Sequence, residues 1–172
     1  MKVSLVVVFA LTVQLSFAQQ AVPQTTGTAR AQPSRFIGTW VLDAAKSTFG
    51  SGQRLTSQIR TYEAFGEGQK STIESVDAAG SRAKYGYAAR FDGRYYPMTG
   101  TGIPNGADAI TIARVDANTI AATLQKAGQE VMEAKLSVSG DGKILTIERT
   151  GTTNAVLVFN RQPAPQRRSR NR

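Results

Sequence analysis

The sequence predicts an all-β protein: an antiparallel up-and-down meander closed into a small β-barrel of about eight to ten strands. Three observations predict it. Apolar and polar residues alternate over short segments, turn residues such as Gly, Asp and Asn separate these segments, and no segment shows sustained helical periodicity. Sequential hairpins need no helical crossovers, and closure removes the exposed edges of the sheet. The alternative is a two-sheet β-sandwich.

The second half of the sequence carries the clearest strand signals. Thr119–Lys126 and Val131–Ser139 alternate between apolar and polar residues, and Ala127-Gly128 provides a short turn between them. The same reasoning predicts three more strands in this half: Ala109–Val115, Ile144–Arg149 and Ala155–Gln162.

The first half gives weaker signals of the same kind. Asp92-Gly93 predicts a tight hairpin turn, because primed turns need positive φ at both central residues. The Gly-rich stretch Thr99–Gly106 is expected to be a flexible loop at an open barrel end; it lacks the Gly-Lys-Ser/Thr ending of a phosphate-binding loop. Five strand candidates are rich in Tyr, Ile, Val and Thr: Phe36–Asp43, Ser57–Phe65, Ser71–Asp77, Ala83–Phe91 and Tyr95–Met98.

The N-terminus predicts export. Lys2, the apolar run Val3–Leu15 and the small residues before Ala18 are typical of a signal peptide, residues 1–18, cleaved after Ala18. The run is shorter than the roughly 20 residues of a spanning helix, so no membrane span is expected. We therefore expect a secreted or periplasmic protein. Its predicted parts are a disordered linker (19–34), one β-barrel domain (35–162) and a disordered Arg-rich tail (163–172).

The composition excludes several kinds of active site. The chain has no cysteine and no histidine, which rules out a Ser-His-Asp triad, a Cys nucleophile and a Cys/His zinc site. The carboxylates mostly fall in turns or on the polar phase of strands, and their spacing matches no metal-binding loop. We expect neither a metal nor another cofactor, and no enzymatic activity.

The positive charge lies mainly outside the predicted barrel. The formal net charge is +9, but Lys2, Arg30 and four tail arginines account for six of these charges. A basic face interleaved with aromatic residues, as nucleic-acid binding requires, is missing from the sequence pattern. The tail instead predicts a weak electrostatic contact with an anionic envelope surface. Its arginines are Arg167, Arg168, Arg170 and Arg172.

Residues near both ends of the predicted barrel carry a resemblance to a known family. A Gly-x-Trp pattern, Gly38-Thr39-Trp40, opens the first strand, and Arg161 lies in the last. This resembles the lipocalin-like (calycin) family, in particular the small exported lipocalin-like domain proteins of bacteria. The resemblance implies a structural role for Gly38, Trp40 and Arg161, with Trp40 packed across the closed end of the barrel beneath Arg161. It also implies an interior able to admit a ligand.

One phase of the predicted strands is suited to line that interior. Tyr85, Tyr87 and Phe91 share one face of a strand, although an ordinary packed core is the commoner explanation of such a stripe. The predicted ligand-binding residues are Tyr85, Tyr87, Phe91, Leu124, Met132 and Leu136. We predict that the barrel binds a small apolar or amphipathic ligand. The alternative is a filled barrel that acts as an envelope interaction module through its basic tail or an edge strand.

Overall fold

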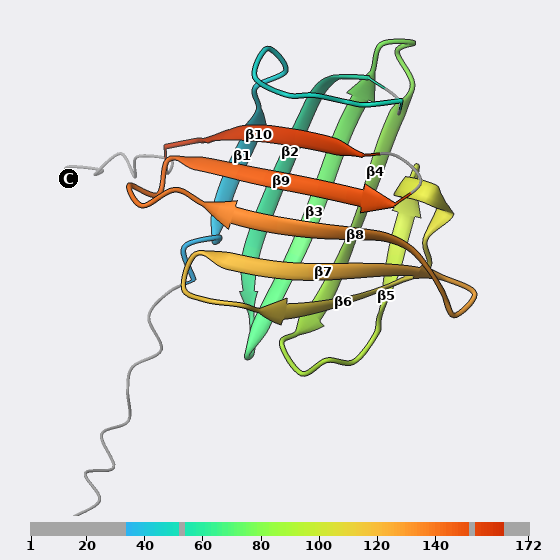
Figure 1. The fold of residues 1–172 in the computed structure, drawn as a ribbon, viewed down its shortest axis with the longest axis vertical. Coiled ribbons are helices and arrows are strands. Elements are labelled where there is room, and N and C mark those ends of the chain that lie inside the picture. The colour runs from blue at the N-terminus through green and yellow to red at the C-terminus, as the bar shows by residue number, and fades with distance from the viewer. Residues whose placement is uncertain (1–33, 52–53, 152–153, 164–172) are drawn as a thin grey trace, which may run out of the picture. The chain divides into compact units, whose positions relative to one another are not determined.

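The chain folds into a closed antiparallel barrel of ten strands, in which each strand pairs with its sequence neighbours and β1 pairs with β10 (Figure 1). This computed structural model describes residues 34–51, 54–151 and 154–163. It confirms the predicted meander and excludes the two-sheet sandwich, because the sheet closes on itself. The predicted signal peptide, and nearly all of the predicted linker and tail, lie outside the described residues.

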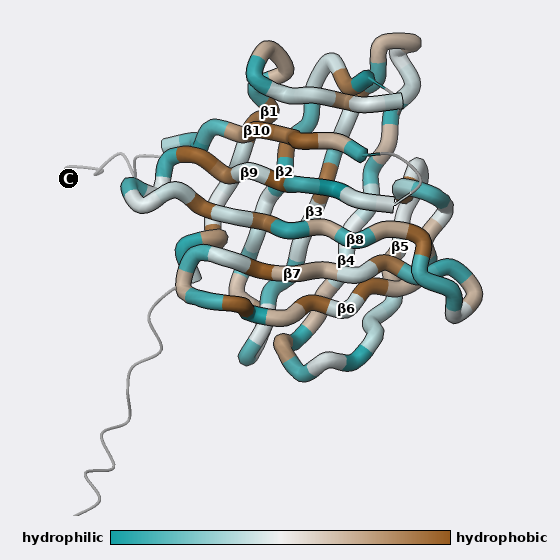
Figure 2. Tube along the Cα trace, viewed as in Figure 1, coloured by the Kyte–Doolittle hydropathy of each residue, from teal (hydrophilic) through white to brown (hydrophobic). Residues whose placement is uncertain are grey.

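Each segment predicted as a strand contains one. The bounds are β1 Gly38–Leu42, β2 Leu55–Phe65, β3 Gly68–Asp77, β4 Arg82–Arg90, β5 Tyr96–Thr101, β6 Ala109–Arg114, β7 Thr119–Lys126, β8 Gln129–Val138, β9 Ile144–Gly151 and β10 Ala155–Arg161. In Figure 1 the strands β6–β10 lie in front of β2–β4 and run across them. Figure 2 shows hydrophobic and hydrophilic residues alternating along the front strands, which directs every second side chain into the barrel.

The connection between β4 and β5 differs from the predicted tight turn. It spans Phe91–Tyr95, and only Gly93 in it has a positive φ, of 75°. The prediction of a two-residue hairpin at Asp92-Gly93 is therefore wrong, since that turn needs both residues in this region. The Asp92 carboxylate instead accepts a hydrogen bond of 2.6 Å from the Tyr96 hydroxyl, which holds the wider loop.

The Gly-rich stretch is only partly a loop. Thr99–Thr101 completes β5, and a short 3₁₀ turn, η1 (Pro104–Gly106), follows. Asn105 adopts φ 55° within this turn, and its Nδ2 donates a hydrogen bond of 2.9 Å to the carbonyl of Val131. The predicted flexible loop is thus shorter than expected and tied to β8.

Trp40 closes one end of the barrel together with the residues that precede β1. Its side chain is fully buried, and its indole Nε1 donates a hydrogen bond of 2.8 Å to the carbonyl of Phe36, which is also fully buried. The guanidinium carbon of Arg161 lies 4.1 Å from the centre of the Trp40 ring. A cation over an indole face at this distance is attracted by the ring quadrupole.

Arg161 also binds the backbone of the segments around it. Its Nε donates to the carbonyl of Gly142 at 2.6 Å, one Nη donates to Ile37 at 2.7 Å, and the other donates to Arg35. Gly38 leaves room for this side chain, because a Cβ at its φ of +131° would lie 2.7 Å from the Arg161 guanidinium. The Gly-x-Trp pattern and the distant arginine therefore form one unit.

Replacing Arg161 with alanine should lower the free energy of unfolding by about 2–4 kcal/mol, because hydrogen bonds from a charged group and a cation–π contact are lost together. Urea denaturation measures this. The control is Arg114→Ala, which removes an exposed arginine stacked 4.8 Å from the Phe91 ring and should cost less than about 1 kcal/mol. Equal losses for the two variants would contradict the structural role of Arg161.

The turn between β7 and β8 contains a strained residue. Ala127 has φ 50°, a left-handed conformation that costs an L-residue about 1–2 kcal/mol. Replacing it with glycine should raise the free energy of unfolding by about 0.5–1 kcal/mol, after allowing for the larger entropy of the unfolded chain. The control Ala121→Gly, within β7, should lower it by about 0.5–1 kcal/mol. A loss of stability in both variants would show that the turn is not strained.

Candidate functional site

The barrel interior has two chemically different sides. We call the inward side chains of β2–β4 the polar wall, in which Ile73 and Ala89 are the apolar exceptions. Its other buried residues are Gln58, Arg60, Tyr62, Gln69, Ser71, Ser75, Asp77, Tyr85 and Tyr87. Buried polar groups are retained in proteins only where they find hydrogen-bond partners, so this wall is a candidate recognition surface.

The inward side chains of β5–β8 form the apolar wall. It consists of aliphatic and methionine side chains from four consecutive strands, and it continues onto β9 and β10 through Leu145, Ile147, Leu157 and Phe159. Its buried residues on β5–β8 are Met98, Ile110, Ile112, Ile120, Ala122, Leu124, Met132, Leu136 and Val138. A molecule between the two walls would meet hydrogen-bonding groups on one side and hydrocarbon on the other.

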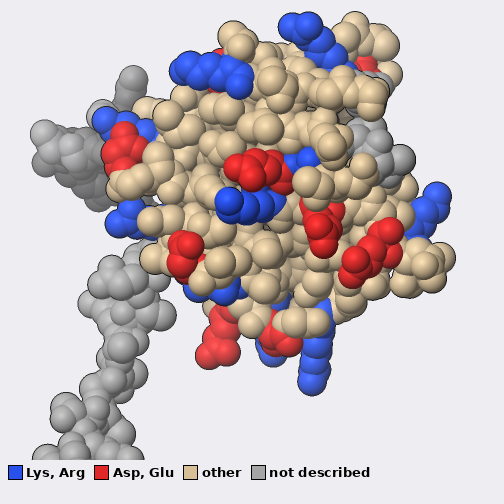
Figure 3. All heavy atoms as spheres, in the orientation of Figure 1, with Lys and Arg blue, Asp and Glu red and all other residues tan. Residues whose placement is uncertain are grey.

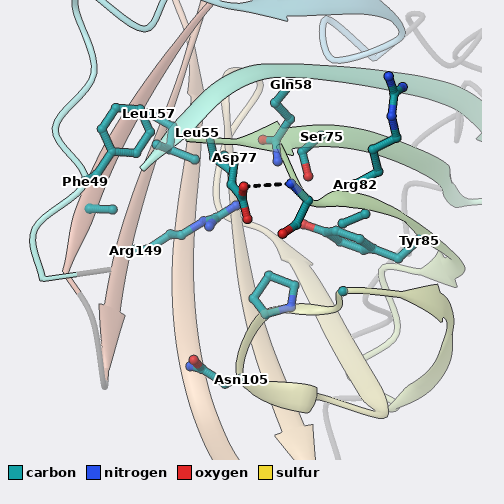
Figure 4. A pocket seen from close by; sticks show the side chains of 15 residues that line it. Phe49, Leu55, Gln58, Ser75, Asp77, Arg82, Tyr85, Asn105, Arg149 and Leu157 are labelled. Atoms are coloured by element: carbon teal, nitrogen blue, oxygen red, sulfur yellow. Dashed lines mark hydrogen bonds between the residues drawn. The ribbon is translucent and has the colours of Figure 1, made fainter. Parts of the chain in front are cut away.

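A cavity of about 290 Å³ opens where the β3–β4 turn, the β5–β6 loop and the start of β10 come together. We call it the mouth cavity. Ligand sites usually occupy about 300–1,000 Å³, so it is at the lower end of that range. Figure 4 shows the side chains of Arg149 and Asp77 pointing toward one another across it, whereas Arg82 points away.

A smaller void of about 40 Å³ lies deeper, between the two walls. Tyr85, Pro104 and Arg149 line both this void and the mouth cavity, so these three residues separate the two spaces. Arg60, Ile73 and Tyr87 of the polar wall, together with residues of the apolar wall, line the rest of the void. The mouth cavity therefore adjoins the interior, and only the side chains of Tyr85, Pro104 and Arg149 line both spaces among the described residues.

Arg60 is held in place inside the barrel. Its side chain is only 7% exposed, and its Nε donates a hydrogen bond of 3.0 Å to Gln58 Oε1. One Nη donates to the Tyr62 hydroxyl at 3.2 Å, and the guanidinium carbon lies 5.5 Å from the centre of the Phe159 ring. All of these neighbours are neutral, so the charge of Arg60 is solvated by dipoles and an aromatic face.

Arg149 brings a second positive charge to the same void. It lies at the end of β9 in the inward phase that begins with Leu145 and Ile147. Burial lowers the pKa of Arg149; the nearby Tyr85 raises the pKa, and the charge of Arg60 lowers it. Arginine nevertheless stays protonated at neutral pH, because its ordinary pKa exceeds 12. The void therefore faces two guanidinium cations.

The part of the polar wall nearer the closed end contains a neutral pair. Gln69 is fully buried, and its Nε2 donates a hydrogen bond of 2.9 Å to the Tyr87 hydroxyl. Gln69 Oε1 has no hydrogen-bond partner within the described part of the chain. Burial, followed by the nearby Tyr62, raises the pKa of Tyr87 well above its ordinary value of 10.0. Tyr87 is thus a neutral hydrogen-bonding group throughout the physiological range.

The structure brings together five of the six residues predicted to bind ligand. Tyr85, Tyr87, Leu124, Met132 and Leu136 all line the small void. Phe91 does not line it: it follows β4 at the end away from the mouth cavity and packs beside Arg114. Phe91 lies beyond the last paired residue of β4. The last side chain of this strand that points into the barrel is the fully buried Ala89.

Sequence reasoning missed the polar residues of the interior. In β2 the apolar residue faces outward, with Ile59 44% exposed, while the charged Arg60 faces inward. Hydropathy alone assigns the wrong phase to this strand. Arg149 could have been found, because it continues the apolar alternation of Leu145 and Ile147 by two residues.

The described residues provide no obvious metal site. In residues 34–51, 54–151 and 154–163, no group of three or more acidic side chains is placed to hold a metal ion. The same ranges contain no helix that is long and apolar enough to cross a membrane.

Comparison with known proteins identifies the class of fold. No protein family and no curated protein sequence matches this chain. Among solved structures, a variant of the fluorescent protein UnaG is similar with a TM-score of 0.52 and 14% identity, covering 76% of this chain and 98% of that one. A Schistosoma mansoni fatty acid binding protein in complex with arachidonic acid gives a TM-score of 0.49 and 14% identity, with the same coverage. These similarities show the fold alone.

The buried hydroxyl of Tyr87 should make the barrel sensitive to alkaline pH. Because the folded pKa is raised, the unfolded chain loses this proton first, so stability falls as the pH rises above about 10. Tyr87→Phe should be less stable at neutral pH, since Gln69 Nε2 loses its partner, and should lose less stability per pH unit above about 10. Urea denaturation across this range measures both. Parallel alkaline slopes in the two proteins would contradict the burial of Tyr87.

Proposed function

We propose that this protein is an exported, non-enzymatic binding protein that holds a small amphipathic molecule inside its barrel. The single observation that carries the proposal is the contact between the mouth cavity and the void at Tyr85, Pro104 and Arg149. An open cavity lined partly by polar groups thereby adjoins an interior lined by hydrocarbon. This arrangement suits a ligand with its apolar part against β5–β8 and its polar part near the mouth.

The void of about 40 Å³ must expand to admit such a ligand. Met98 and Met132 both line it, and unbranched methionine side chains repack more readily than β-branched ones. Pro104 lies in the short β5–β6 connection between two positive-φ glycines, Gly102 and Gly106. The lining of the void thus includes two adaptable side chains and one loop residue, which can move to admit a ligand.

Export rests on the N-terminal sequence, in which a basic residue, an apolar run and small residues precede Ala18. The site itself supports binding rather than catalysis. Among the buried residues that the structure describes, Asp77 is the one carboxylate, and it accepts hydrogen bonds from the backbone N–H groups of Ala79 and Ser81. Through these hydrogen bonds Asp77 stabilises the β3–β4 turn.

A second candidate function is a filled barrel that acts as an interaction module. The small volume of the void favours it, because about 40 Å³ is space for little more than one water molecule. Figure 3 shows acidic and basic residues interspersed over one face of the molecule, without a patch of a single sign. The Arg-rich tail that would supply an electrostatic contact lies outside the described residues.

Filling the void should separate the two functions. Ala122 faces inward and lines the void, whereas its neighbour Ala121 is exposed. We expect the neutral fluorescent probe N-phenylnaphthylamine to bind saturably, and Ala122→Leu to weaken that binding about tenfold, because added methylenes overpack the interior. Ala121→Leu is the matched control and should bind like the unmodified protein.

Fluorescence titration measures both affinities. Equal probe affinity in the two leucine variants, or no saturable binding by the unmodified protein, would overturn ligand binding inside the barrel and favour the filled module.

A further inference from the structure

We propose that Asn105 and Gly106 form a self-modification site, at which Asn105 deamidates in the folded protein with the assistance of Lys126. The dipeptide lies in η1, the short turn of the β5–β6 connection, and Asn105 also lines the mouth cavity (Figure 4). The reaction removes a hydrogen-bond donor that ties this loop to β8. The inference goes beyond ligand binding and does not depend on it.

The turn itself favours this pair of residues. Asn105 has φ 55° and Gly106 has φ 65°, both in the left-handed region that asparagine and glycine tolerate best. A Cβ at Gly106 would also lie only 3.2 Å from the Nζ of Lys126. A glycine leaves its own backbone nitrogen sterically unhindered, and the side-chain amide of asparagine is chemically labile. The conformation that builds the mouth loop therefore creates a reactive dipeptide, and Asn105 is the one asparagine in the sequence that precedes a glycine.

The reaction is an intramolecular cyclisation followed by hydrolysis. The backbone nitrogen of Gly106 attacks Cγ of Asn105 and forms a C–N bond. The side-chain nitrogen of Asn105 leaves as ammonia, which carries away the proton of the Gly106 amide. Water then adds to either carbonyl of the cyclic imide and opens the ring, which gives aspartate or isoaspartate. Water is the only co-reactant, and no atom is oxidised or reduced.

The turn is accessible and held by few bonds. No residue of η1 is buried, and Asn105 and Gly106 are exposed. The attacking nitrogen donates a hydrogen bond of 3.0 Å to the carbonyl of Ile103, and the next amide, that of Ala107, donates to Pro104 at 3.1 Å. A single turn of this kind opens locally without unfolding the barrel. Such opening makes the Gly106 nitrogen available for attack.

Lys126 brings a positive charge to the reacting bond. It ends β7, and its Nζ, Cε and Cδ lie 3.2, 3.6 and 3.8 Å from the position of a Cβ at Gly106. Four ion pairs occur among the described residues, and Lys126 takes part in none of them. Negative charge develops on the side-chain oxygen of Asn105 during the attack, and a neighbouring cation stabilises it. Lys126 therefore favours the reaction in the folded chain.

Deamidation removes one attachment of the mouth loop. Asn105 Nδ2 donates a hydrogen bond of 2.9 Å to the carbonyl of Val131 in β8. The carboxylate that replaces the amide has no proton to donate, and it carries a negative charge toward that carbonyl oxygen. The charge also joins the lining of the mouth cavity. The β5–β6 loop, which places Pro104 between the mouth cavity and the void, is held less firmly afterwards.

Mass spectrometry of the unmodified chain measures the reaction. Folded protein kept at mildly alkaline pH, in water enriched in a heavy oxygen isotope, should gain one heavy oxygen at Asn105, with isoaspartate as one product. Isoaspartate identifies the cyclic imide, because direct hydrolysis gives aspartate alone. Asn154 is an internal control: it is exposed but precedes Ala155, and it should react at least about tenfold more slowly. The proposal is overturned if Asn105 stays intact in the folded protein for as long as it takes to react completely in urea.

The variant Lys126→Gln tests the assistance. We expect it to slow deamidation of the folded protein at least about threefold, because the charge beside Gly106 is lost. In urea the variant and the unmodified chain should react at the same rate, since Lys126 no longer lies beside Gly106. The control Lys143→Gln removes an exposed lysine from the β8–β9 turn and should leave the folded-state rate unchanged. Equal folded-state rates for Lys126→Gln and the unmodified chain would contradict the role of Lys126.

The variant Asn105→Asp reproduces one product of the reaction, and hydrogen exchange measures its effect on the loop. The amides of Gly106 and Ala107 should exchange at least about tenfold faster than in the unmodified protein, because their turn has lost a hydrogen bond to β8. Asn154→Asp makes the same chemical change in another exposed segment and should leave both amides unaffected. Unchanged exchange in Asn105→Asp would contradict the loosening of the mouth loop.

Discussion

The pairing of β1 with β10 is the interaction on which the rest of the structure depends, because it turns a ten-stranded meander into a closed wall with an interior. The seam is short, with three residue pairs that begin at Trp40 and Arg161. Arg161 reinforces it by stacking on Trp40 and by binding the backbone of the segment before β1 and of the β8–β9 turn. Arg161 thus joins the first and last strands of the barrel. It does so at the closed end, away from the mouth cavity.

Closure has a chemical consequence, because it places the inward faces of β2–β4 opposite those of β5–β8. Polar residues gather on the first face and hydrocarbon on the second. A fully apolar interior would be the more stable solution, since buried charges lose their hydration. Arg60 and Arg149 nevertheless face the void between the two walls, and Arg149 also lines the mouth cavity.

The fold could be predicted from the sequence more fully than the site. The alternation of apolar and polar residues, together with the turn residues, located all ten strands. One face of each strand packs into the core, so every second residue of a strand tends to be apolar. The tight turn at Asp92-Gly93 failed because side-chain bonds of Asp92, invisible to a dipeptide rule, support a longer loop. The polar wall was missed because Arg60 faces inward and Ile59 outward, which reverses in β2 the hydropathy rule that assigns strand faces.

The central claim is that a ligand lies inside the barrel, and methionine methyl NMR tests it most directly. The chain has three methionines, of which Met98 and Met132 line the void and the third is Met1, within the predicted signal peptide. In mature protein labelled at the methionine methyl groups and titrated with dodecanoate, we expect both resonances to shift together and to saturate at one equivalent. Saturable binding of dodecanoate that leaves both resonances unmoved would contradict the account, because the ligand would then lie outside the barrel.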